Sequence, residues 1–70
     1  MIEVFKTNIQ EIDVSKQIIQ KLREHIPNSK INFDLDDCDN ILRIESNFIN
    51  NEKVKFILKS MGYQCEVLPE

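Results

Sequence analysis

The chain has few of the residues on which most catalytic motifs depend. It contains one glycine, two prolines, two cysteines and no tryptophan in 70 residues. A single glycine excludes the glycine-rich loops that hold nucleotide phosphates. No nucleophile stands in a recognisable turn motif and no carboxylate pair has a catalytic context, so we expect no enzymatic activity and no catalytic residue. No apolar run approaches the roughly 20 residues that a membrane-spanning helix needs.

Charge and cysteine content narrow the class of partners further. The net charge at pH 7 is −3, which argues against general attraction to nucleic acid or to an anionic membrane. Two cysteines are too few for a disulfide framework, which fits a reducing compartment. The N-terminal residues MIEVFKTN lack the pattern of a signal peptide. We therefore expect a cytoplasmic protein that binds neither nucleic acid nor a membrane.

Hydrophobic periodicity predicts six elements within one domain, residues 1–70. Strands alternate with a period of two, and helices carry an apolar stripe at three- and four-residue spacing. In chain order the elements are a strand at 2–5, a helix at 14–26, a hairpin with strands at 31–35 and 42–44, a helix at 51–61 and a strand at 63–67.

The helix ends carry sequence signals of their own. Asp13 is the favoured N-cap of the first helix, and Asn8, with a glutamate three residues later, is the alternative. Pro27 ends that helix because its ring clashes with the preceding turn. Asn50 is a good N-cap for the second helix, and Gly62 stands where a left-handed C-terminal cap is needed.

The order βαββαβ predicts an α+β fold with two layers. Both helices should cover one face of an antiparallel sheet. Right-handed crossovers then give the ferredoxin-like sandwich with strand order 4-1-3-2. RNA-binding modules of this topology carry aromatic residues on both central strands, whereas the third strand here offers Ile41 and Arg43, so RNA binding is not expected.

Phe5 and Ile41 are expected on the sheet face that the helices leave open. Together with Arg43 they predict a small docking patch for a protein partner. The alternative is that these scattered apolar residues only pack on one another across neighbouring strands.

The layout resembles that of heavy-metal-associated domains, the copper-chaperone-like modules. The similarity rests on the element order, on the loop after the first strand, and on the ending Met61-Gly62-Tyr63 of the last helix. The stretch NFDLDDCDNILRIE, residues 32–45, resembles a variant branch of that family with an acidic hairpin. The resemblance implies that a metal carrier of this kind would have an M-x-C-x-x-C motif in the first loop, where two thiolates hold a soft ion such as Cu(I).

The first loop of this chain, TNIQEID, carries no cysteine. We therefore expect a non-enzymatic interaction module without a cofactor, a variant of the family that lacks the soft-metal thiols. The alternative is metal handling through other ligands, namely Cys38 with Asp36, Asp37 and Asp39, or through a site formed between two chains. A solvated, turn-forming acidic tip is the simpler interpretation of these aspartates, so a metal site is not expected.

The two sulfur atoms are expected to lie apart. Cys38 should lie at the hairpin tip, at the end of the sheet opposite the first loop. Cys65 should lie on an edge strand and point toward the helices, as a small packed hydrophobe. The distance between the Cα atoms of cysteines so placed exceeds the roughly 7 Å that a disulfide allows. The same geometry predicts that the first loop is remote from both thiols.

Overall fold

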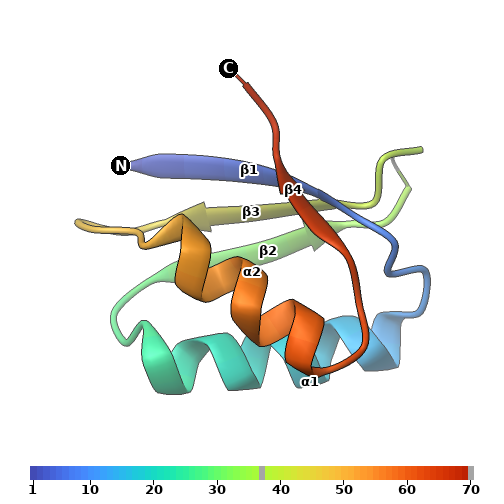
Figure 1. Cartoon of the computed structure of the whole chain (residues 1–70), viewed down its shortest axis with the longest axis horizontal. Coiled ribbons are helices and arrows are strands. Elements are labelled where there is room, and N and C mark those ends of the chain that lie inside the picture. The colour runs from blue at the N-terminus through green and yellow to red at the C-terminus, as the bar shows by residue number, and fades with distance from the viewer. Residues whose placement is uncertain (37, 70) are drawn as a thin grey trace.

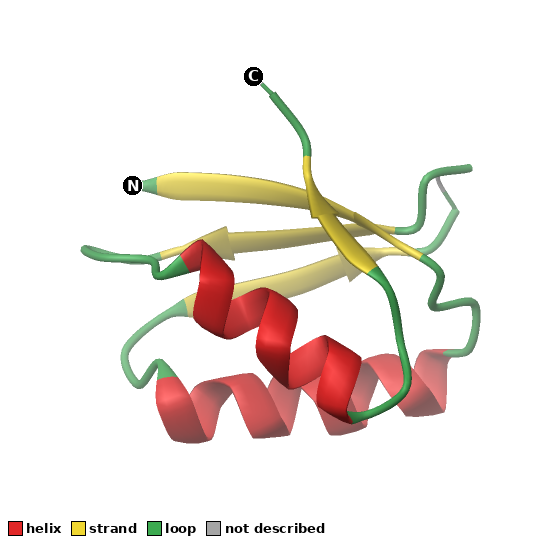
Figure 2. Ribbon diagram, in the orientation of Figure 1, coloured by secondary structure: helices red, strands yellow, loops and turns green. Residues whose placement is uncertain are grey.

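The computed structural model describes residues 1–36 and 38–69, and their elements follow the expected order. The elements are β1 (Ile2–Thr7), α1 (Ile12–His25), β2 (Lys30–Asp34), β3 (Ile41–Glu45), α2 (Asn51–Ser60) and β4 (Cys65–Val67). The strands form one antiparallel sheet in the order β2-β3-β1-β4, and both helices cover the same face of it (Figure 1, Figure 2). The α+β class and strand order are confirmed, and they are consistent with a ferredoxin-like sandwich. Neither described helix has the length and hydrophobicity to cross a bilayer.

The two helices begin differently. The N-cap of α1 is Glu11, whose side chain makes no capping hydrogen bond, so the prediction of Asp13 as the cap is wrong. Asp13 lies in the first turn, where a carboxylate favours the positive end of the helix dipole. The prediction for α2 is confirmed, because the Oδ1 atom of Asn50 accepts a hydrogen bond of 3.2 Å from the N–H of Lys53.

The C-terminus of α2 is closed by a Schellman motif. Gly62 has a φ angle of +95°, a region that side chains with a Cβ atom rarely adopt. Its N–H donates to the carbonyl of Lys59 at 3.0 Å, and the N–H of Tyr63 donates to the carbonyl of Leu58 at 2.9 Å. The turn therefore satisfies two terminal carbonyls and directs the chain into β4.

Replacing Gly62 with alanine should lower the free energy of unfolding by about 1–2 kcal/mol. No atom lies within 4 Å of the position a Cβ would take, so the whole loss should come from backbone strain. Urea unfolding measures it, and Lys59→Ala is the control, since an exposed helical position should change stability by less than about 0.5 kcal/mol. Equal stability of the two variants would show that the turn tolerates a side chain.

The core lies between the sheet and the two helices. Strands, helices and the loops that flank them all contribute residues to it. Its buried members are Phe5, Ile9, Ile18, Leu22, Ile31, Leu42, Ile44, Ile49, Val54, Ile57 and Leu58. The expected helix stripes are therefore confirmed at their central positions.

The side chains of β1 face the opposite way from the expectation. Phe5 is fully buried in the core, paired with Leu42 of β3 and with Val67 of β4. The prediction that Phe5 lies on the open sheet face is wrong. Ile2 and Val4 lie there instead, since a one-residue shift of the alternation moves every side chain of a strand to the other face. Phe5 holds the central place between two neighbouring strands, where the largest apolar side chain is best covered by the helical layer.

The tip of the β2–β3 hairpin lies at the same end of the sheet as the loop after β1 (right in Figure 1). Lys6 at the end of β1 pairs with Ile41 at the start of β3. The N–H of Thr7 donates to the carbonyl of Asp39 at 3.2 Å, and its Oγ1 donates to the carbonyl of Asn40 at 2.6 Å. The prediction that the tip lies at the opposite end is wrong. A helical crossover makes β1 and β2 parallel and brings both of their C-terminal ends to the same end of the sheet.

Candidate functional site

The loop after β1, residues 8–11, is tied to the rest of the fold by its own polar groups. The Oγ1 atom of Thr7 accepts a hydrogen bond of 3.2 Å from the N–H of Ile9, whose side chain is fully buried. The Oδ1 atom of Asn8 accepts one of 2.9 Å from the N–H of Gln64. This contact continues the β1–β4 ladder past its last strand pair. The loop residues therefore brace the sheet.

The structure places the two thiols differently from each other. Cys38 lies in the exposed turn of the hairpin, and Cys65 is half-buried at the start of β4, where it packs against the core as expected. Cys65 pairs with Thr7 in the β1–β4 register, directly before the first loop. The prediction that this loop is remote from both sulfurs is therefore wrong for Cys65, because β4 runs beside the end of β1. For Cys38 the basis of that prediction also fails, since the hairpin tip lies at the same end of the sheet as the loop. Both cysteines are free.

Burial dominates the acid–base behaviour of Cys65. It raises the pKa of the thiol from an ordinary value of 9.0 to about 11, an effect that Lys55 opposes and Glu66 reinforces. The thiolate is the form that attacks electrophiles and binds soft metals. At neutral pH Cys65 is therefore an inert, uncharged side chain.

We expect alkylating reagents to modify Cys38 well before Cys65 in the folded protein. A rise in pKa of this size leaves roughly 100-fold less thiolate than an ordinary thiol at the same pH. The neutral thiol of Cys65 contributes stability that is fully present below pH 9.0 and is lost as the pH rises to about 11. Time-resolved mass spectrometry with iodoacetamide at pH 8, repeated in urea as the control, measures both rates. Equal rates in the folded protein would contradict the placement of Cys65.

Two aspartates of the acidic hairpin tip form contacts within the fold. The Oδ1 atom of Asp34 accepts a hydrogen bond of 3.2 Å from the N–H of Asp36, and Asp39 forms an ion pair of 3.7 Å with Lys6. Asp37, a member of the alternative metal set, lies outside the described residues. Among the residues that the structure describes, no three His, Cys, Asp or Glu side chains gather as a metal site would require. Local turn formation accounts for the described aspartates.

The predicted docking set is not brought together. Ile41 and Arg43 lie on the open sheet face, the first half-buried opposite Lys6 and the second exposed opposite Val4. Phe5 points into the core on the other face. The open face therefore lacks the aromatic residue on which the prediction depended.

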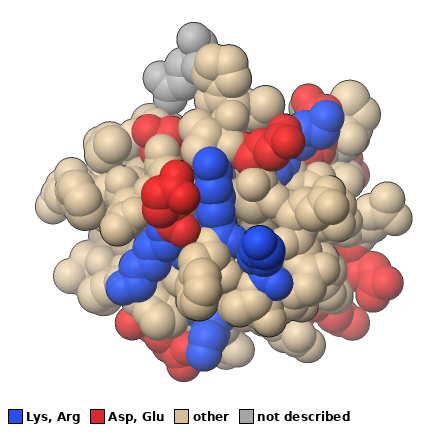
Figure 3. All heavy atoms as spheres, viewed as in Figure 1, with Lys and Arg blue, Asp and Glu red and all other residues tan. Residues whose placement is uncertain are grey.

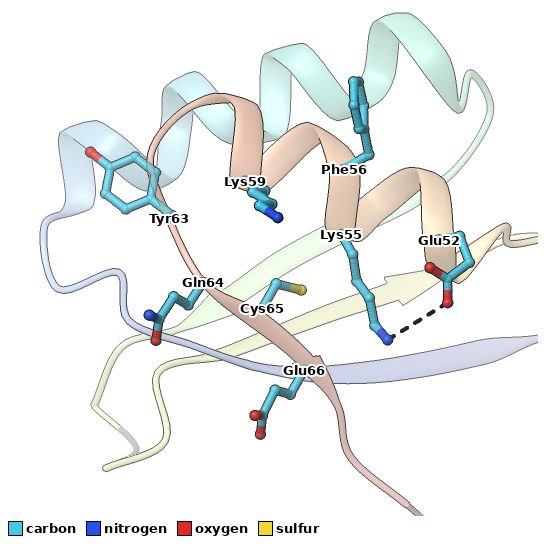
Figure 4. A pocket seen from close by; sticks show the side chains of 8 residues that line it. All are labelled: Glu52, Lys55, Phe56, Lys59, Tyr63, Gln64, Cys65 and Glu66. Atoms are coloured by element: carbon cyan, nitrogen blue, oxygen red, sulfur yellow. Dashed lines mark ion pairs between the residues drawn. The ribbon is translucent and has the colours of Figure 1, made fainter.

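A groove that the sequence pattern did not reveal lies between α2 and β4. Its volume is about 680 Å³, and one wall is an outer stripe of α2 at helical spacing. In Figure 4 the Cys65 side chain points toward α2, Lys55 reaches across toward the strands, and Glu66 points to the other side of β4. The lining residues are Glu52, Lys55, Phe56, Lys59, Tyr63, Gln64, Cys65 and Glu66.

The most exposed apolar side chain of this groove is Phe56. Its exposed fraction is 70%, although phenylalanine usually contributes to a core. The residue lies outside the buried stripe of α2, which is formed by Val54, Ile57 and Leu58. An aromatic residue at a polar helical position was the one signal by which the sequence could have indicated this surface.

The two sides of β4, the one that faces α2 and the one that carries Glu66, differ in charge. The Nζ atom of Lys55 lies 3.7 Å from a carboxylate oxygen of Glu52 on the same helix. Lys59 and Glu66 form no ion pair with any residue that the structure describes. On the face that carries α2, basic atoms gather near the centre with acidic groups around them (Figure 3). The helix side of β4 is therefore basic. On the other side Glu66 lies opposite Lys6, whose Nζ atom is 3.7 Å from a carboxylate oxygen of Asp39, so two carboxylates surround one ammonium group there.

Comparison with protein-family models gives no match for this chain, and comparisons with curated proteins and with solved structures give no significant match. The geometry of the molecule alone therefore supports a functional proposal.

Proposed function

We propose that the chain is a non-enzymatic interaction module that binds a segment of a protein partner in the groove between α2 and β4. The observation that carries this proposal is the exposure of Phe56, 70%, beside a hollow of about 680 Å³. Exposed aromatic residues with a polar surround are typical of binding surfaces. Tyr63 and the aliphatic stems of Lys55 and Lys59 add apolar area to the same groove.

The open sheet face is the weaker candidate. The most exposed apolar residue of its central strand β1 is Ile2, at 37%, about half the exposure of Phe56. Its other apolar residues, such as Val4 and Ile41, are already half-buried by their neighbours. Cross-strand packing accounts for them without a partner.

The scaffold belongs to the same proposal. We take the chain as a heavy-metal-associated-like domain in which the first loop has exchanged soft-metal ligands for structural contacts. The bonds from Thr7 and Asn8 support this, since they use the polar groups that the loop offers. Metal handling remains the alternative, and no described cluster of ligands favours it. A cytoplasmic location is part of the proposal, supported by the free thiol of exposed Cys38.

Selection from a random peptide library displayed on phage tests the function. Peptides enriched on the immobilised protein should lose at least about 30-fold in affinity for Phe56→Glu, because removing a central aromatic anchor typically costs about 2 kcal/mol or more. Phe48→Glu is the matched control, since Phe48 is 72% exposed but does not line the groove. Its affinity should stay within about twofold of the wild type. Fluorescence anisotropy measures all three.

Two outcomes would contradict the proposal. One is a selection that enriches no peptide above the bare support. The other is a set of peptides that bind the wild type and both variants alike. Urea unfolding of each variant shows that a loss of binding does not come from a loss of folding.

A further inference from the structure

We infer that the partner segment binds in an extended conformation, as an additional strand along the free edge of β4, and that it alternates apolar or acidic residues with basic ones. This inference rests on the proposed function of the groove and specifies the ligand that the groove accepts. It is carried by the backbone of β4 and by the charges on its two sides.

β4 has one paired and one unpaired edge. In the described part of the chain it pairs only with β1. The N–H of Leu68 donates to the carbonyl of Val4 at 2.8 Å, and the N–H of Gln64 points the same way, toward Asn8. Backbone groups of neighbouring residues in an antiparallel strand point in opposite directions. The N–H and C=O groups of Cys65 and Val67 therefore face the free edge.

An added strand would pair with these four groups. Pro69 follows at the next outward-facing position and has no N–H to donate, so the edge beyond Val67 offers no further donor at that position. A helical ligand has no free backbone groups with which to pair, whereas an extended segment does. The free edge therefore favours a short extended segment.

The two faces of β4 dictate which side chains the segment carries. Residues opposite Cys65 and Val67 share their face, and the residue opposite Cys65 points into the groove, toward Lys55 and Lys59 of α2 (Figure 4). Apolar or acidic side chains suit those positions. The residue between them shares the face of Glu66, where a basic side chain suits the carboxylate, because Lys6 opposite Glu66 already forms an ion pair of 3.7 Å with Asp39.

A second copy of the chain does not meet this requirement. In the antiparallel register that pairs the whole of β4 with its own copy, Glu66 would lie directly opposite Glu66. Like charges in that position are destabilising. The occupant is therefore a segment of a different protein, with basic residues at alternate positions.

A pair of N-methylated peptides tests the inference directly. The probe is the acetylated, amidated pentapeptide Glu-Lys-Val-Lys-Glu, in which the glutamates and the valine face the groove. N-methylation of the central valine removes a donor aimed at β4, whereas N-methylation of a lysine removes one aimed at solvent. We expect the first change to weaken binding by about three- to tenfold, from the loss of one hydrogen bond. The second should change it by less than about twofold.

Amide hydrogen exchange and chemical shifts locate the contact. Addition of the probe at several millimolar should slow exchange at the amides of Cys65 and Val67, which face the free edge. A peptide of the same composition in the order Glu-Glu-Val-Lys-Lys is the control for charge alone. The Glu66→Lys variant should prefer the peptide Glu-Glu-Val-Glu-Glu, because only the side of β4 that carries residue 66 changes sign and the groove with Lys55 and Lys59 stays basic.

The possible failures are distinguishable. Absence of slowed exchange at Cys65 and Val67, or equal weakening by the two N-methyl groups, would overturn the extended-strand inference. If the extended-strand inference fails in this way but library-selected peptides still lose affinity for Phe56→Glu, the proposed function of the groove stands. Loss of both effects would overturn both.

Discussion

Replacing Phe5 with alanine should lower the free energy of unfolding by about 3–5 kcal/mol. The side chain is fully buried, so its removal loses transfer free energy and leaves a cavity in the centre of the core. A chain of 70 residues has a total stability of about 4–10 kcal/mol, since stability is typically about 0.05–0.15 kcal/mol per residue. The variant should therefore be partly unfolded at 25 °C or close to it. Urea unfolding followed by circular dichroism measures the effect.

Phe56→Ala is the matched control, because it removes the same side chain from a position that is 70% exposed. It should change stability by less than about 0.5 kcal/mol. A small effect of Phe5→Ala, similar to that of the control, would place Phe5 on the open sheet face and reverse the assignment of both faces of β1.

Replacing Thr7 with valine should lower the free energy of unfolding by about 2–4 kcal/mol, although valine has nearly the same shape. The threonine hydroxyl is buried, donates to the carbonyl of Asn40 at 2.6 Å and accepts from the N–H of Ile9 at 3.2 Å. Valine leaves both backbone groups without a partner, and each such group costs about 1–3 kcal/mol. Urea unfolding gives the total, and faster amide exchange at Ile9 identifies the lost bond.

Thr7→Ser keeps the hydroxyl and removes only a methyl group, so it should cost about 1 kcal/mol. A valine variant as stable as the serine variant would contradict the proposed bracing of the first loop. It would show that packing of Ile9, not the hydroxyl of Thr7, holds the loop against the hairpin.

Local signals predicted the element order well. Asn50 and Gly62 mark the ends of α2 because each satisfies a specific backbone requirement of a helix terminus. The alternation of β3 was equally clear, since Leu42 and Ile44 are buried and Arg43 is exposed. Together with the crossover rules these signals were sufficient for the fold class and the strand order.

The face of β1 could not be read in the same way. Both alternating sets of this strand contain apolar residues, Ile2 and Val4 in one and Phe5 in the other. The choice depends on which set lies opposite the core residues of the neighbouring strands, and that is a property of the whole sheet. The place of the hairpin tip, by contrast, follows from the topology itself, since the parallel strands β1 and β2 finish at the same end of the sheet.

The groove depends on features that periodicity does not contain. Its existence is set by how α2 packs against a short edge strand and by the direction in which the backbone of Cys65 and Val67 points. Only the exposed aromatic residue on α2, Phe56, left a trace in the sequence. The sequence therefore predicted the fold but not the groove between α2 and β4.

Backbone chemical-shift mapping with a library-selected peptide on isotope-labelled protein tests the central claim most directly. We predict that the perturbed amides concentrate in α2 and β4, around Phe56 and Cys65, with little change elsewhere. Perturbations concentrated on the open face, around Val4 and Arg43, or on the hairpin tip at 34–40, would contradict the claim that the groove between α2 and β4 is the binding surface.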